Sequence, residues 1–195
     1  MKKIVFATNN KHKLSEITDI LKDTYTIVSL NEIGFYEDIP ETQPTIEGNA
    51  QQKAQFIYDR YSINCFADDT GLEVDCLNGA PGVYSARYAG KNATYQQNVL
   101  KLLKEMQGQK DRNCRFKTVI CLITNTKSYF FEGIVEGTIT EQQLGTNGFG
   151  YDPVFIPKGY NITYAQMTQE QKNSISHRAI AVKKLTDFLT QNNYE

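Results

Sequence analysis

The adjacent carboxylates of Asp68-Asp69-Thr70-Gly71 have the clearest capacity for chemistry in this sequence. They stand between two strand-like runs, residues 64–67 and 72–77, so we expect them at the end of a buried strand. Acids in that position are costly unless a cation or hydrogen bonds compensate them. Hard carboxylate oxygens favour Mg²⁺, with Mn²⁺ as a substitute, over Zn²⁺, and Glu41 is a candidate third carboxylate. A turn of solvated acids is the alternative.

The triplet Asp69-Thr70-Gly71 also matches the short motif of aspartic proteases. Those enzymes need two such triplets, from one chain or from a homodimer, in a largely β protein. This chain has one copy and several helical patterns, so its sequence argues against a protease.

A candidate anion site lies between Thr8 and Lys13, where a β-rich run at residues 2–8 gives way to a helical pattern over 14–21. Free backbone N–H groups at a helix start attract anions, and Lys13 adds a positive charge. A helix cap with a solvated lysine is the alternative. Neither the P-loop nor the dinucleotide-binding fingerprint is present.

A glycine-rich segment over residues 145–153 precedes Lys172 and Ser176-His177-Arg178. Its glycines allow a close ligand approach, Phe149 and Tyr151 offer stacking faces, and His177 with Arg178 can donate to a carbonyl or phosphate. This combination predicts a nucleotide-base site, with a surface His-Arg pair at a helix start as the alternative. In a second glycine-rich loop, 79–90, Arg87 could hold a phosphate or brace the loop.

Strand and helix patterns alternate along the chain. Helices are expected after residue 10, after Thr45 as N-cap, and after the capping boxes at Thr94 and Thr168. Further strands are expected at 26–30, 116–124 and 129–139, the last two forming a hairpin through 125–128. We therefore predict an α/β fold in which helices flank a mixed central β-sheet, as a single domain of residues 1–195.

The composition is that of an ordinary globular protein: 195 residues, 40% hydrophobic, with a formal net charge of −1. This charge provides no global field for nucleic acid or an acidic membrane, so a polyanion site must be local and neither partner is expected. Four cysteines without a C-x-x-C pair predict buried free thiols in a reducing compartment, and no apolar run has signal-peptide or membrane-span length. We expect a soluble, cytoplasmic protein. The cysteines are Cys65, Cys76, Cys114 and Cys121.

Taken together, the motifs resemble the inosine triphosphate pyrophosphatase family nearly from end to end. The resemblance rests on Thr8-x-Asn10-x-x-Lys13, Pro40-Glu41-Thr42, Asn49-Ala50-x-x-Lys53-Ala54, Ala67-Asp68-Asp69-Thr70-Gly71-Leu72, residues 79–88, Gly148-Phe149-Gly150-Tyr151-Asp152-Pro153 and Ser176-His177-Arg178.

This resemblance implies two lobes with a nucleotide cleft between them, in a homodimer. It also implies Mg²⁺-dependent hydrolysis of non-canonical purine nucleoside triphosphates (ITP, dITP and XTP) between the α and β phosphates. The products are a monophosphate and pyrophosphate, and the reaction cleanses the nucleotide pool. Two alternatives stay open: a nucleotide-sensing binding module without turnover, and a related pyrophosphatase for modified pyrimidine or canonical nucleotides.

The resemblance also assigns roles to residues of this chain. Asp69 would accept the proton of the attacking water, with Asp68 as a second catalytic carboxylate, and Glu41 and Asp69 would hold the metal. The residues implied to bind substrate are Thr8, Asn9, Asn10, Lys11, His12, Lys13, Lys53, Thr70, Phe149, Gly150, Tyr151, Asp152, Lys172, His177 and Arg178.

Two positions depart from the family's pattern. The common glutamate before Asn49 is Gly48 here, which displaces the acid to Glu47, and the usual small residue after Thr42 is replaced by Gln43-Pro44. Both departures bear on the local helix start and on the metal role of that segment.

Overall fold

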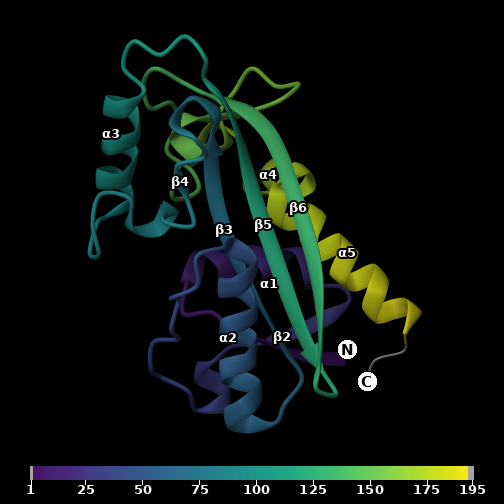
Figure 1. The fold of residues 1–195 in the computed structure, drawn as a ribbon. Helices are drawn as coiled ribbons and strands as arrows, with labels where there is room; N and C mark the ends of the chain where they lie inside the picture. The colour runs from purple at the N-terminus through teal and green to yellow at the C-terminus, as the bar shows by residue number, and fades with distance from the viewer. Residues whose placement is uncertain (1, 193–195) are drawn as a thin grey trace. The chain divides into compact units, whose positions relative to one another are not determined.

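The computed structural model describes residues 2–192, which form five α-helices and a seven-stranded mixed sheet (Figure 1). The strands are β1 (Lys2–Phe6), β2 (Tyr25–Val28), β3 (Cys65–Val74), β4 (Pro81–Gly82), β5 (Asn113–Thr124), β6 (Lys127–Ile139) and β7 (Phe155–Pro157). The helices are α1 (Lys11–Leu21), α2 (Ile46–Tyr61), α3 (Tyr95–Glu105), α4 (Gln169–Ile175) and α5 (His177–Gln191).

The sheet has the strand order β2-β1-β3-β5-β6-β7, with β4 paired to β3 off this path. Strand β1 pairs in parallel with both β2 and β3, whereas β4 and β7 pair antiparallel with β3 and β6. Strands interleaved with helices and a sheet of both pairing types confirm the predicted α/β class.

The contacts divide the chain into two compact units. Unit 1 comprises the described part of residues 1–69, 118–133 and 178–195, and unit 2 comprises residues 70–117 and 134–177. The predicted single domain spans both, and its residues 1 and 193–195 lie outside the described part.

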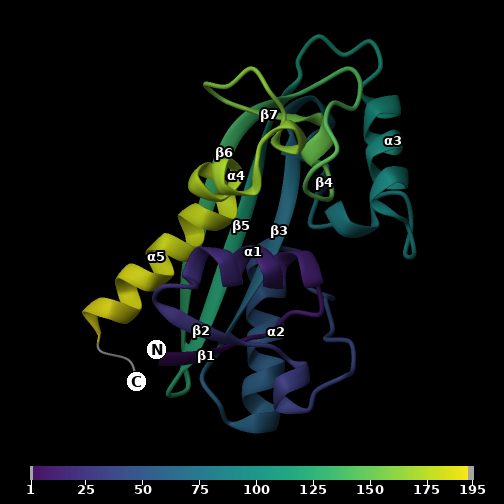
Figure 2. The same ribbon diagram turned by 180° about the vertical axis from the view of Figure 1, so that it is seen from behind.

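In unit 1, alternate residues of β3 face different helices. Phe66 stacks on Phe6 of β1 with ring centroids 4.6 Å apart, in a core that also contains Ile17 of α1 and Leu185 of α5. Figure 2 views the ribbon from the side on which α1 lies. Cys65 points the other way and donates its thiol to the carbonyl of Ala54 in α2 over 3.3 Å. Because side chains alternate along a strand, α1 and α5 cover one face of β3, and α2 covers the other.

The predicted end of a strand before Asp68 is wrong. Strand β3 runs without a break through both acids to Val74, and residues 75–77, expected as strand, form a 3₁₀ turn. The acids are tolerated inside the strand because lysine and arginine side chains from the covering helices neutralise them. The prediction treated charged residues as the end of a strand, and it could not take into account ion pairs with residues that are distant in the sequence.

Most other predicted elements are confirmed with small shifts of their ends, but the single helix expected after Thr168 is divided into α4 and α5 by Ser176, whose backbone is extended. Thr45 caps α2 by accepting from the backbone N–H of Gly48, and Thr94 forms the expected capping box with Gln97. The hairpin of β5 and β6 turns through Asn125 and Thr126, which have φ angles of 49° and 67°. Positive φ at both central residues is the conformation that tight hairpin turns require.

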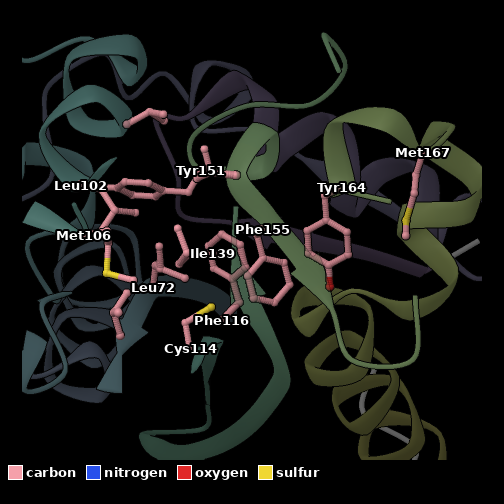
Figure 3. Close-up of a cluster of buried hydrophobic side chains, with 13 residues drawn as sticks. Leu72, Leu102, Met106, Cys114, Phe116, Ile139, Tyr151, Phe155, Tyr164 and Met167 are labelled. Atoms are coloured by element: carbon pink, nitrogen blue, oxygen red, sulfur yellow. The ribbon is translucent and has the colours of Figure 1, made fainter. Parts of the chain in front are cut away.

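Unit 2 is organised around a second apolar core, shown in Figure 3. Leu72 of β3 and Leu102 of α3 contribute to it, together with an aromatic group in which the Phe116 and Phe155 rings meet edge to face at 4.6 Å. This core is separate from that of unit 1, with Phe116 near the start of β5 belonging to unit 2 and Ile120 farther along belonging to unit 1.

All four cysteines are free, as predicted, and three of them are buried. Burial raises the pKa of the Cys65 and Cys121 thiols to about 12, which keeps both protonated. Cys76, expected to be buried, is half-exposed. Among residues 2–192, none of the helices combines the length and the apolar character that a bilayer span requires.

Candidate active site

Asp68 is enclosed by charged side chains from α1 and α5. Its Oδ1 lies 3.1 Å from Lys13 Nζ, and its Oδ2 accepts from Arg178 Nε over 3.2 Å. Arg178 also donates through Nη1 to the carboxylate of Glu16, one turn along α1 from Lys13. Asp68, Arg178 and Glu16 are all buried.

This enclosure decides the charge of Asp68. Burial acts to raise the pKa of the Asp68 carboxyl, but the positive charges of Lys13, Arg178 and Lys53 outweigh it and hold the pKa well below its usual range. Asp68 is therefore a permanent carboxylate whose oxygens face cations. Through its two ion pairs Asp68 fixes the positions of the Lys13 and Arg178 side chains.

Asp69 points toward α2 and has different partners. Its Oδ1 lies 3.2 Å from Lys53 Nζ, and its Oδ2 accepts from Asn49 Nδ2 over 3.3 Å. The same Lys53 ammonium lies 2.5 Å from Glu41 Oε1. Two carboxylates, from β3 and from the irregular segment before α2, therefore share one buried ammonium group.

The pKa of Asp69 moves in the opposite direction from that of Asp68. Burial raises the pKa of the Asp69 carboxyl; Lys53 and Lys13 oppose the rise, while the negative charges of Glu41 and Asp68 add to it. Burial would lower the pKa of Lys53, but Asp69, Glu41 and Asp68 raise it overall, so its ammonium stays charged. A carboxylate with a raised pKa has the basicity that a proton acceptor needs near neutral pH.

The predicted anion site at residues 8–13 is partly a helix cap. Asn10 accepts from the backbone N–H groups of His12 and Lys13 at 3.0 and 3.2 Å, which confirms the capping alternative for Asn10 and occupies donors expected to face an anion. The Thr8 hydroxyl accepts from the N–H of Asn10 over 3.2 Å. Asn9 is exposed, and its amide donates to the Glu37 carbonyl over 2.8 Å.

The remaining cations of this segment differ in exposure. Lys11 and His12 project from the first turn of α1 and are exposed, whereas the Lys13 side chain is only 13% exposed and reaches Asp68. The alternative of a solvated Lys13 is therefore wrong. Lys13, Lys53 and Arg178 are brought together around the two acids; Asn9, Lys11 and His12 are not. Thr70 is half-buried and follows Asp69 as the first residue of unit 2.

In unit 2, Asp152 and Lys172 form a buried ion pair beneath Phe149. Lys172 Nζ donates to Asp152 Oδ2 over 2.6 Å and lies 4.7 Å from the centroid of the Phe149 ring. Asp152 Oδ2 also accepts from the Phe149 backbone N–H over 2.8 Å. Gly148, with φ of 74°, is required here because a Cβ at that position would clash with the Asp152 carboxylate. The Asp152–Lys172 ion pair therefore holds the half-buried Phe149 ring in place.

Tyr151 does not offer the stacking face that its sequence position predicts. Its ring is buried in the apolar core of unit 2, and its hydroxyl donates to the Ser85 carbonyl over 2.9 Å. Gly150, with φ of 62°, leaves the space beside it open. Between Phe149 and Tyr151, Gly150 takes a positive φ, which breaks the regular alternation of side chains, so Phe149 stays half-buried while Tyr151 enters the core.

The Tyr151–Ser85 contact also gives the 79–90 loop a role. The Ser85 hydroxyl accepts from the Leu72 N–H and donates to the Gly82 carbonyl, so the loop is fastened to β3. Arg87 lies over the Tyr84 ring at 5.2 Å, the arrangement of a loop brace.

His177 and Arg178 are both buried, so the alternative of a surface pair at the start of α5 is wrong. His177 stacks on Phe116 with ring centroids 4.5 Å apart, within unit 2. Arg178 belongs to unit 1, where its Nε and Nη1 meet Asp68 and Glu16.

Two residues of this geometry were not predicted as site residues, namely Glu16 and Asn49. Glu16 occupies a position of α1 where a charged residue normally faces solvent, so no local pattern distinguishes it. Asn49 stands in a motif that carried the family resemblance, which is the signal that could have identified it.

The donor set fits Mg²⁺. No group of three or more His, Cys, Asp or Glu side chains within residues 2–192 could hold a metal ion, so Asp68 does not join Asp69 and Glu41 in one. Glu41 and Asp69 nevertheless both turn carboxylate oxygens to one cation, the Lys53 ammonium. Two carboxylates completed by water and phosphate oxygens are the usual protein contribution to a Mg²⁺ site.

Comparison with known proteins extends over nearly the whole chain. The sequence profile of the Ham1 family matches residues 4–188. A dITP/XTP pyrophosphatase from Porphyromonas gingivalis is 55% identical, covering 97% of this chain and 98% of the relative. One from Flavobacterium johnsoniae is 54% identical, covering 96% and 98%. These matches confirm the family resemblance predicted from the motifs.

Solved structures are similar over the same length. The Staphylococcus aureus Ham1 protein has a TM-score of 0.88 at 40% identity, covering 98% of this chain and all of that one. A HAM1 protein from Coxiella burnetii has a TM-score of 0.89 at 38% identity, with the same coverage.

Proposed function

The chain belongs to the Ham1 family, and we propose that it hydrolyses non-canonical purine nucleoside triphosphates such as dITP, ITP and XTP, and so cleanses the nucleotide pool. The observation that carries the proposal is the Glu41–Lys53–Asp69 arrangement, in which a buried carboxylate of raised pKa stands beside cations. The names of the relatives supply the substrate class.

In the reaction, water attacks the α-phosphorus of the substrate. Asp69 accepts the proton of that water as the new P–O bond forms, and the bond from the α-phosphorus to the α,β-bridging oxygen breaks. Pyrophosphate leaves with the bonding electron pair, and a nucleoside monophosphate remains. Lys53 and Lys13, both held by the acids, provide positive charge toward the phosphates, which is the main requirement of phosphoryl transfer.

Glu41 and Asp69 would hold a Mg²⁺ ion, for which Mn²⁺ could substitute. When bound, the ion neutralises phosphate charge and aligns the reacting groups. For the base we assign the Phe149 face, the Asp152–Lys172 pair and His177 of unit 2. The nucleotide cleft between two lobes stays a prediction of the resemblance.

A product-resolved assay tests this function. With dITP and Mg²⁺ we expect dIMP and pyrophosphate in equal amounts, and EDTA should abolish turnover until excess Mg²⁺ is restored. Orthophosphate with dIDP would contradict the bond that we assign. A panel of ITP, XTP, GTP, ATP and modified pyrimidine triphosphates separates the proposed substrates from the related pyrophosphatases. Nucleotide binding without turnover would favour the sensing module.

The proposal also includes a homodimer in the cytoplasm. The dimer is what the family resemblance implies. The free thiols support a reducing compartment. Sedimentation at 22.2 kDa, the mass of one chain, would refute the dimer.

A further inference from the structure

The segment that carries Glu41 has no regular secondary structure, so the partners of its backbone N–H groups decide how well it is fixed. The Thr42 N–H donates to Gln52 Oε1 over 2.9 Å, and Gln52 Nε2 donates back to the Thr42 hydroxyl over 2.8 Å. The Gln43 N–H donates to Asn49 Oδ1 over 2.9 Å. The two residues after Glu41 are therefore both bound to side chains of α2.

These side chains share one face of α2. Asn49, Gln52 and Lys53 stand at i, i+3 and i+4, which places them next to one another on the helix. The helix start is fixed by the Thr45 cap. Consequently the ammonium that meets the Glu41 carboxylate and the amides that hold its neighbours come from a single turn of one rigid element.

Asn49 also connects this segment to Asp69. Its side chain is fully buried; its oxygen accepts from the Gln43 N–H, while its nitrogen donates to Asp69 Oδ2. A rotation that improved one of these bonds would lengthen the other, because the amide group is planar. Asn49 therefore couples the placement of the segment that carries Glu41 to the orientation of the Asp69 carboxylate.

We infer that Gln52 and Asn49 are positioning residues that set the Glu41 carboxylate against Lys53 and Asp69, so that the two acids form one preorganised cation site. The inference rests on the proposed function, because it takes Glu41 and Asp69 as the metal ligands. Without these amides the half-exposed Glu41 would stand on an irregular segment whose next two residues have lost their hydrogen bonds to α2.

Gln52 offers the sharper test because it bonds Thr42 and does not contact Asp69. Gln52→Ala removes both bonds, whereas Gln52→Glu keeps an acceptor for the Thr42 N–H and hydroxyl. Gln51→Ala is the matched control: it makes the same change one position away, at an exposed residue of the same helix. The primary measurement is Mn²⁺ binding without nucleotide, followed by the electron paramagnetic resonance signal of free Mn²⁺. Thermal unfolding and the Mg²⁺ dependence of dITP hydrolysis accompany it.

We expect Gln52→Ala to raise the Mn²⁺ dissociation constant about tenfold, the scale on which groups that orient a metal ligand act. The Mg²⁺ concentration for half-maximal activity should rise in parallel, and excess Mg²⁺ should restore kcat. Gln52→Glu should bind Mn²⁺ no more weakly than the unmodified protein, and Gln51→Ala should match that protein.

An unchanged Mn²⁺ dissociation constant for Gln52→Ala would overturn the inference, whether or not the unfolding temperature falls. Absence of Mn²⁺ binding to the unmodified protein would overturn it as well. If the binding pattern holds but dITP yields no pyrophosphate, the proposed function fails while the positioning of Glu41 stands, so the two failures are distinguishable.

Discussion

Asp68 and Asp69 are neighbours in the chain, but their carboxylates face opposite sides of β3 and have no partner in common in their closest ion pairs. Asp68 meets Lys13 and Arg178 from α1 and α5, and Asp69 meets Lys53 from α2. Their pKa values move apart, down for Asp68 and up for Asp69. Such a separation assigns different roles to two acids of one site.

Asp69→Asn should lower kcat for dITP about 10²–10⁴-fold, the usual contribution of a positioned proton acceptor. An asparagine retains the shape and can still accept from Asn49, so nucleotide binding measured without Mg²⁺ and the unfolding temperature should change little. Stopped-flow binding and a pyrophosphate assay measure the two effects. If binding is lost in proportion to turnover, Asp69 acts through affinity and is not the base.

Asp68→Asn should instead act on stability. The substitution leaves the buried Arg178 and the largely buried Lys13 with less compensating charge, and breaking a buried pair typically costs about 3–5 kcal/mol. Urea unfolding measures the loss. Glu132→Gln, an exposed carboxylate of β6, is the comparison. A stable Asp68→Asn protein with abolished turnover would show that Asp68 has the more direct role in catalysis that the family resemblance implies.

Substitutions of Tyr151 and Phe149 should have different effects, the first on stability and the second on KM. Tyr151→Phe removes the bond to the Ser85 carbonyl and should lower the free energy of unfolding by about 1 kcal/mol, with KM for dITP unchanged. Phe149→Ala removes the face above Lys172 and should raise KM several-fold, since stacking on a base contributes about 1–3 kcal/mol. Equal effects on KM would mean that Tyr151 also contacts the substrate.

Gly48 and Gln43, the two departures from the family's pattern, lie against each other. A Cβ on Gly48 would stand 2.9 Å from Gln43 Cβ and 2.9 Å from the Thr45 hydroxyl oxygen. Gly48→Ala should therefore lower the free energy of unfolding by about 1–3 kcal/mol, although alanine is the better helix former by about 1 kcal/mol. Thermal and urea unfolding of the variant provide the measurement.

A substitution at position 43, added to Gly48→Ala, tests whether contact with the Gln43 Cβ causes the loss of stability. Gln43→Gly removes the opposing Cβ and should recover part of the loss, whereas Gln43→Ala keeps that atom and should recover none. Equal recovery by both would show that the clash lies elsewhere, for example at the Thr45 hydroxyl.

Local sequence patterns predicted most helices and strands, but they did not predict which charged residues form ion pairs. The caps at Thr45 and Thr94 act within one helical turn, so their residues predict the helix starts directly. The partners of Asp68 come from positions 13 and 178, and strand alternation assigns them only once β3 is known to continue through both acids. Buried Glu16 has the same local pattern as an exposed helical acid. Tyr151 differs from Phe149 only in the direction imposed by a tight turn.

The burial of Arg178 between Glu16 and Asp68 has a consequence for biosynthesis. While the ribosome is still making the chain, Glu16 and Asp68 emerge more than 100 residues ahead of the guanidinium that neutralises both. Until then the first-made segments would have to enclose two acids without the guanidinium that contacts both, which is unfavourable in a dry interior. Completion of the charge cluster must therefore wait for the last helix, and chains interrupted before it should be left to proteases and chaperones.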